Sequence, residues 1–159
     1  MAVAAQVPLI CAVTIQTSLS PKRLVQERGS ARNLGRWRAV HVVLFTALAA
    51  IALGIAGTQI VVPVGVMANG FSDLGSVALI RNLFALTGAA LICAAVAGPS
   101  FGWILPFAWT ILPFVFFSSP AADPTGILTL IMQPDRSFVP WSGALAVWGA
   151  GFAIAVRRS

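Results

Sequence analysis

Charged residues are gathered into one segment of this chain, and almost everything else is apolar. Residues 21–38 hold six of the ten lysines and arginines, with Glu27 as the only acid among them. The chain of 159 residues is 58% hydrophobic and 9% charged, with a mean hydropathy of +0.93. Soluble globular domains carry about a quarter charged residues, and a chain with so few cannot cover a water-facing surface. The sequence therefore predicts an integral membrane protein.

Five apolar runs have the length of membrane-crossing helices, since a hydrocarbon core about 30 Å thick needs about 20 apolar residues. The first run is the most polar, because it contains Gln6 and Gln16. A further apolar segment, GILTLIM, is too short to span and predicts a short external helix that is either interfacial or re-entrant. We expect an all-α polytopic fold in a single transmembrane domain, residues 1–159, with spans at about residues 2–19, 37–57, 76–98, 101–119 and 141–156.

Positive charge sets the expected orientation, because basic residues beside membrane spans stay on the cytoplasmic side. With the basic connector 21–38 inside, alternating spans bring Arg157 and Arg158 to the same side and leave Asp73 and Asp123 outside. The sequence therefore predicts a multi-pass protein of the cell membrane. Its connector and C-terminus are expected in the cytoplasm and its N-terminus outside.

The remaining composition argues against several functional classes. The net charge of +6 lies beside apolar spans, where anionic lipid attracts it, so we expect no nucleic-acid partner. Cys11 and Cys93 lie in separate apolar runs, which disfavours a disulfide framework or a zinc site. HExxH, GxSxG and GxxxxGK[ST] motifs are absent from the sequence. We therefore expect no enzymatic activity, no cofactor and no metal site.

Arg81 is the most informative single residue, because an arginine within a span costs several kcal/mol unless it reaches water or a partner. It lies about one turn inside the third predicted span. There it can snorkel to the outer surface or pair with Asp73, Asp123 or Asp135. A structural interface anchor and a residue lining a substrate path or pore both stay open as interpretations. Asn82 beside it is predicted to hydrogen-bond across helices. His41, one turn into the second span, is placed at the headgroup boundary.

Small residues at close spacing predict faces where helices approach one another, within the bundle or in a homo- or hetero-oligomer. They occur in the second, third and last spans: Ala50 and Gly54; Ala85, Ala89 and Cys93; Gly143, Ala146, Gly149, Ala150 and Ala153.

The connector, LSPKRLVQERGSARNLGRWRAVHVVLF, resembles the cytoplasmic connection after the second span of ABC-2-type transporter permeases. Members often carry an E-R/K-x-G-T-like element there, and Glu27-Arg28-Gly29-Ser30 is similar to a truncated form of it. The stretch RNLFALTGAALICAAVAG, with its GP turn and a proline-containing next span, is similar to small actinobacterial permease-like proteins of exporter operons. The short apolar helix before the last span resembles the external re-entrant element of that family. The likeness covers residues 18–159 in layout. There are two departures. The family usually has six spans and five are predicted here, so that the first would be missing or the start site misplaced, and no leucine-rich run follows the ERGS element.

The resemblance implies a permease subunit of an ATP-driven exporter. The connector would dock on a separate ATP-binding subunit through Leu24, Val25, Glu27 and Arg28. Two copies, or this chain with a paralogue, would line the path of a hydrophobic or peptide-like cargo. The alternative is a non-transporting membrane scaffold or anchor whose connector recruits cytosolic partners or anionic lipid. A self-contained proton-coupled transporter is disfavoured, because no predicted span contains Asp or Glu.

Overall fold

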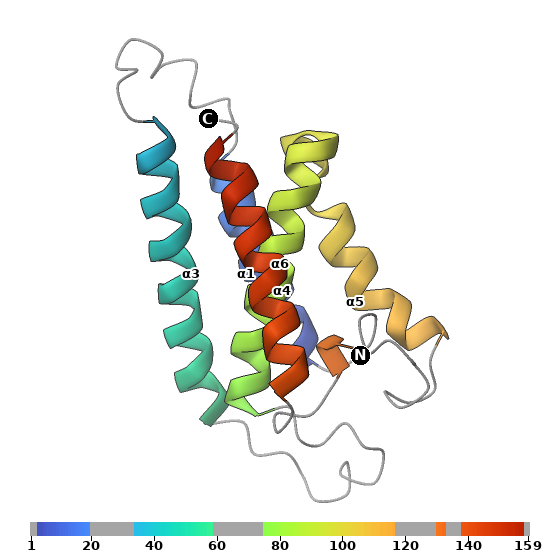
Figure 1. The fold of residues 1–159 in the computed structure, drawn as a ribbon. Helices are drawn as coiled ribbons and strands as arrows, with labels where there is room; N and C mark the ends of the chain where they lie inside the picture. The colour runs from blue at the N-terminus through green and yellow to red at the C-terminus, as the bar shows by residue number, and fades with distance from the viewer. Residues whose placement is uncertain (1–2, 20–33, 59–74, 117–129, 133–137, 158–159) are drawn as a thin grey trace, which may run out of the picture.

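The structure is a computed structural model that describes residues 3–19, 34–58, 75–116, 130–132 and 138–157. Within these ranges all regular structure is helical, and the expectation of an all-α fold is confirmed. The helices alternate in direction along the chain, so the ends of α1, α4 and α6 lie beside the starts of α3 and α5 (Figure 1). The α-helices are α1 (Val3–Ser18), α3 (Leu34–Thr58), α4 (Ser76–Ala97), α5 (Ile104–Phe116) and α6 (Phe138–Arg157), and the short 3-10 helices are η4 (Pro99–Phe101) and η6 (Leu130–Met132).

Helix α4 is the centre of the bundle. It contacts α1, α3, α5 and α6, and Figure 1 shows it enclosed between them. From residue 78 to residue 91, every side chain except those of Ile80 and Phe84 is buried. A helix that is covered on nearly all sides is apolar on nearly all sides. The uniform apolar sequence of α4 therefore follows from its central position.

Helices α4 and α6 cross with their backbones in contact. A Cβ added to Gly88 would lie 2.5 Å from the carbonyl oxygen of Val147, and one added to Gly151 would lie 2.5 Å from the carbonyl oxygen of Gly88. Neither position has room for a side chain. The small-residue faces predicted from the sequence locate this contact only in part. Ala85 and Ala89 are buried on α4, but a Cβ at Gly149 of α6 would meet no atom within 4 Å.

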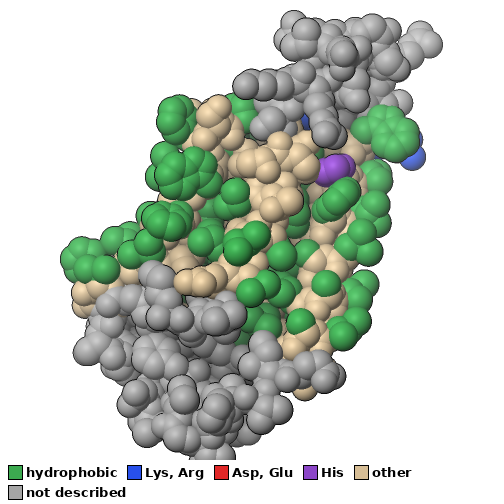
Figure 2. Space-filling view, turned by 180° about the vertical axis from the view of Figure 1, so that it is seen from behind, with side chains coloured by type: hydrophobic (Ala, Val, Ile, Leu, Met, Phe, Trp, Pro, Cys, Tyr) green, Lys and Arg blue, Asp and Glu red, His purple; other side chains and the backbone are tan. Residues whose placement is uncertain are grey.

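The outer surface of the bundle is largely apolar. Over residues 35–58 of α3, only Val42, Thr46 and Leu53 are buried. Hydrophobic side chains run along the face of the molecule in Figure 2, while the histidine and the arginine atoms visible in this view lie near one end. Two helical segments, Gly35–Thr58 and Ser76–Ala97, are long and apolar enough to cross a membrane. The large apolar side chains exposed on α3 are Trp37, Val40, Val43, Leu44, Phe45, Leu48, Ile51 and Ile55.

Two boundaries differ from the sequence-based prediction in an informative way. Helix α3 begins at Leu34, so the last five residues of the predicted connector form its first turn. Backbone hydrogen bonds and good helix formers such as arginine carry a helix beyond its apolar run. Of the fourth predicted span, residues 101–119, the first residue is the last of η4 and residues 104–116 form the 13-residue helix α5. Pro106 lies in the first turn of α5, where its missing N–H does little harm.

Candidate functional site

A polar cluster lies inside the bundle where α4 meets η6. The Arg81 side chain is 0% exposed, and its Nε and Nη2 donate to Asn82 Oδ1 at 3.3 and 3.2 Å. Asn82 Nδ2 in turn donates to the carbonyl oxygen of Ile131 at 2.9 Å. One amide therefore accepts from a buried cation on α4 and donates to the backbone of η6. This arrangement holds two segments together that lie 49 residues apart in the chain.

Apolar packing fixes η6 in the position that this hydrogen bond requires. Leu130 and Ile131 are 5% and 2% exposed, so the described part of the connection between α5 and α6 is inside the bundle. Ile131 packs with Ala12 of α1 and Leu86 of α4. Leu130 packs with residues of α4 and α6, Ala85 and Ala144. A short apolar segment inserted among four helices is compatible with the re-entrant form of the predicted external helix.

The burial of Arg81 differs from the surface position expected of an interface anchor. An arginine that snorkels keeps its guanidinium in water or among headgroups, whereas this one is enclosed by protein. The predicted carboxylate partners, Asp73, Asp123 and Asp135, lie outside the described residues. A charge enclosed at this depth is costly unless its donors are satisfied. The acceptor oxygen of Asn82 meets part of that requirement.

The other predicted site residues fall into two groups. Leu24, Val25, Glu27 and Arg28, the predicted ATPase contacts, lie outside the described residues. His41 lies on α3, where its Nε2 is 2.8 Å from the Ser18 hydroxyl and its ring stacks on Phe45 with centroids 4.3 Å apart. This contact ties the end of α1 to the first turns of α3.

Two features of the interior were missed by sequence reasoning. Gln16, treated only as a polar residue that weakens the first span, is 2% exposed and donates from Nε2 to the Pro99 carbonyl oxygen at 2.9 Å. Its amide lies against Gly102, where a Cβ would overlap it. The available signal was a glutamine in an apolar helix, which favours a buried hydrogen bond. The second feature is the hydrogen bond between Asn82 and η6: the apolar segment GILTLIM predicted an interfacial or re-entrant helix but did not indicate this partner.

The described residues offer interactions and little reactive chemistry. Across these ranges, no group of three or more His, Cys, Asp or Glu side chains comes together to hold a metal ion. Cys11 and Cys93 are both free thiols, and Cys93 Sγ donates to the Phe101 carbonyl oxygen at 3.2 Å. Its polar groups can form hydrogen bonds, its arginines can pair with anions, and its apolar surface can pack against other apolar groups. Comparisons of the chain with protein-family models, curated proteins and solved structures find no match.

Proposed function

We propose that the chain crosses the cell membrane several times, with the end of the bundle that carries Arg36 and Arg157 in the cytoplasm. The supporting observation is the apolar outer surface, above all the exposed face of α3. Soluble monomeric proteins rarely expose a contiguous apolar surface of this kind to water. The cations lie where α3 begins and α6 ends, beside Trp37, whose side chain is 73% exposed. Cations and tryptophan at one end of an apolar bundle are typical of a cytoplasmic membrane interface.

Labelling of single cysteines tests this orientation. Ser30→Cys and Asp123→Cys are introduced separately into a chain whose Cys11 and Cys93 are replaced by alanine. A membrane-impermeant maleimide should label position 30 only from the cytoplasmic side and position 123 only from outside. Labelling of both positions from the same side would overturn the proposed topology.

Within this topology, the function that we propose is that of a permease subunit in an ATP-driven, ABC-2-like exporter. The observation that carries the proposal is Arg81, a cation enclosed in an apolar bundle and bonded to Asn82. Ionisable residues at membrane depth typically mark a substrate or ion path. A purely structural role is served as well or better by apolar side chains of similar volume. The cargo class is hydrophobic or peptide-like.

The contact between α4 and α6 bears on where such a path would run. The backbones at Gly88 and Gly151 touch, so a path between these two helices within one chain is closed. A path between two copies, or between this chain and a paralogue, would not require these two helices to separate. Coupling to ATP hydrolysis belongs to a separate subunit, docked on the connector 21–38 through Leu24, Val25, Glu27 and Arg28.

Two measurements test the exporter proposal. An ATPase encoded in the neighbouring open reading frame should co-purify with the wild-type chain and should be lost from the Glu27→Ala/Arg28→Ala double variant. Arg81→Leu should lower the ATPase activity of the assembled complex, with Arg81→Lys retaining more of it. Retained ATPase binding in the double variant would refute the docking role. An equal loss of complex and activity in Arg81→Leu would instead support a structural role for that residue.

A non-transporting scaffold or anchor is the second candidate, favoured by the concentration of cations at one end. Arg36, Arg38 and Arg157 lie there, and no acidic residue occurs in any described range. Such a surface suits anionic lipid or an acidic cytosolic partner. The two candidates differ in whether a neighbouring ATPase binds, so the co-purification experiment separates them.

A further inference from the structure

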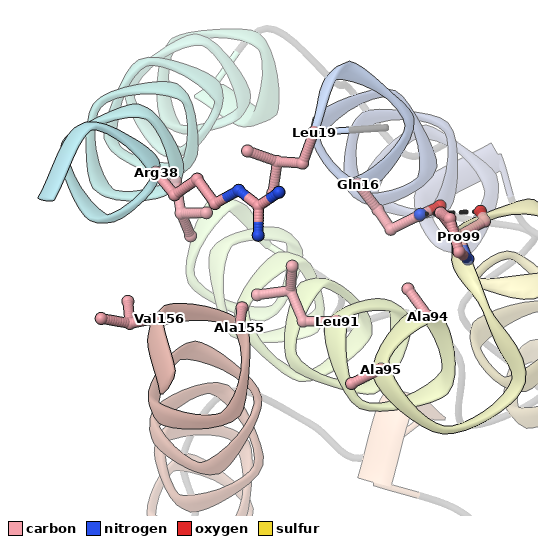
Figure 3. A pocket seen from close by; sticks show the side chains of 10 residues that line it. Gln16, Leu19, Arg38, Leu91, Ala94, Ala95, Pro99, Ala155 and Val156 are labelled. Carbon is pink, nitrogen blue, oxygen red and sulfur yellow. Dashed lines mark hydrogen bonds between the residues drawn. The ribbon is translucent and has the colours of Figure 1, made fainter. Parts of the chain in front are cut away.

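A cavity of about 330 Å³ opens at the end of the bundle where α1, α4 and α6 end and α3 begins. Figure 3 shows side chains from these four helices arranged around it. Ligand sites in proteins typically measure about 300–1,000 Å³, so this volume is sufficient for a small group. Most of its wall is apolar, including Val42 of α3, Leu91 of α4 and Val156 of α6. The polar residues among those that line it are Gln16 and Arg38.

Arg38 extends from the first turns of α3 into this cavity (Figure 3). Its Nε atom is buried, and no hydrogen-bond partner for it exists among the residues that the structure describes. A guanidinium is always charged and carries five N–H donors, so leaving one of them buried and unpaired costs stability. The side chain as a whole remains partly exposed, which leaves the cavity accessible to a ligand.

The charge around Arg38 indicates the kind of ligand that fits. The four acids of the chain are Glu27, Asp73, Asp123 and Asp135, and all of them lie outside the described ranges. The described cations at this end therefore have no carboxylate among the described residues. An anion is the charge-complementary occupant, and a phosphate accepts from a guanidinium in bidentate geometry.

Gln16 lies at the wall of the cavity with its amide turned into the protein. Its Nε2 donates to the Pro99 carbonyl oxygen, which can only accept, so the orientation of the amide is determined. The Oε1 atom is left buried, with no hydrogen-bond partner in the described part of the chain. Because this oxygen is closed off from solvent, Arg38 is the polar group through which a ligand in the cavity would be held.

We propose that this cavity binds the headgroup of an anionic phospholipid, with Arg38 contacting the phosphate and the apolar wall of α4 and α6 lying beside an acyl chain. The proposal rests on the membrane embedding proposed above. A lipid accounts for the combination of one cationic group with a mainly apolar wall, whereas free phosphate leaves that wall without a partner. Basic pockets between membrane helices on the cytoplasmic side are well suited to lipid phosphates. Phosphatidylglycerol has both an anionic phosphate and acyl chains, and is the probe of choice.

Lipid binding to the full chain, purified in an uncharged detergent, is measured by native mass spectrometry and thermal unfolding. The ligands compared are phosphatidylglycerol, phosphatidylcholine, glycerol 3-phosphate and inorganic phosphate. We expect phosphatidylglycerol to bind and to raise the unfolding temperature, because a ligand specific for the folded state stabilises it. Arg38→Gln should weaken this binding by about tenfold or more, the effect of losing one charge-assisted hydrogen bond. Arg36→Gln is the matched control, since Arg36 is exposed on the same helix and carries the same charge; it should change the affinity by less than about twofold, as a screened surface charge does.

A second variant tests the same cavity without depending on correct folding of the Arg38→Gln protein. Ala155→Leu fills the cavity from α6 while leaving every charge in place, and it should also weaken phosphatidylglycerol binding. Three results would each overturn the proposal: equal losses in Arg36→Gln and Arg38→Gln, equal binding of phosphatidylcholine, or an equal effect of the two soluble phosphates. Failure of the membrane proposal looks different, since the wild-type chain would then be monodisperse without detergent.

Discussion

The contact of α4 with α6 gives the sharpest prediction, because two glycines on neighbouring helices differ completely in their surroundings. Gly88→Ala places a methyl group 2.5 Å from the Val147 carbonyl oxygen and 2.6 Å from the backbone nitrogen and Cα of Trp148. These are backbone atoms and cannot rotate away. Ordinary contact needs about 3.5 Å, so the helices must separate locally by about 1 Å, which loses dispersion contacts along the interface.

The expected cost follows from opposing terms. Overpacking of a well-packed interface typically costs about 1–3 kcal/mol, whereas replacing a helical glycine with alanine gains up to about 1 kcal/mol. We therefore expect Gly88→Ala to lower the free energy of unfolding by about 1–2 kcal/mol. Gly149→Ala on α6 is the control, because its Cβ would meet no atom within 4 Å. It should be neutral or stabilising by up to about 1 kcal/mol.

Thermal and denaturant unfolding of both variants in the same detergent provides the measurement. A loss of about 1–2 kcal/mol corresponds to a fall of a few degrees in Tm for a chain of this size. The reasoning would be refuted if Gly88→Ala matched the wild type, or if Gly149→Ala were destabilised as much as Gly88→Ala.

Two further changes probe the buried hydrogen bonds. Asn82→Leu removes the acceptor of Arg81 and the donor to η6, and should lower the free energy of unfolding by about 2–5 kcal/mol. Thr87→Val is the control, because the buried Thr87 hydroxyl has no hydrogen-bond partner among the described residues. It should be close to neutral in the same unfolding assay. Gly102→Ala should displace the Gln16 amide and cost about 1–2 kcal/mol, and a variant that also carries Gln16→Ala should show no additional loss from the added methyl.

The helical class and most boundaries could be predicted because apolar run length is a local property of the chain. The third span, predicted at residues 76–98, is α4 at Ser76–Ala97. Its end is marked by Gly98, whose φ of 99° lies in the region that favours glycine, followed by Pro99. The start of α3 was placed three residues too late, because Leu34 to Arg36 are helical without being part of an apolar run.

The interior of the bundle was not predictable in the same way, because it depends on contacts between distant parts of the chain. Spacing identifies small residues on α4 and α6, but not the register that opposes Gly88 to Gly151. Likewise, the sequence places Arg81 near the start of a span, but it does not show that η6 packs against this part of α4. The Arg81 side chain is 0% exposed, and Asn82 beside it bonds to the backbone of Ile131, 49 positions further along the chain.

These contacts also bear on which parts of the chain would move if it exports a cargo. The α4–α6 contact joins two long helices through their backbones, whereas η6 is a single short turn held to Asn82 by one side-chain hydrogen bond and to Ala85 and Leu86 by apolar packing. The energy needed to separate η6 from α4 is therefore much smaller than that needed to part α4 from α6. As a hypothesis, the segment that moves during transport is η6, whose withdrawal breaks its hydrogen bond to Asn82. A disulfide formed in an Ala85→Cys/Leu130→Cys variant should then abolish transport, and reduction should restore it. Unchanged transport with that disulfide formed would contradict this assignment of the moving element.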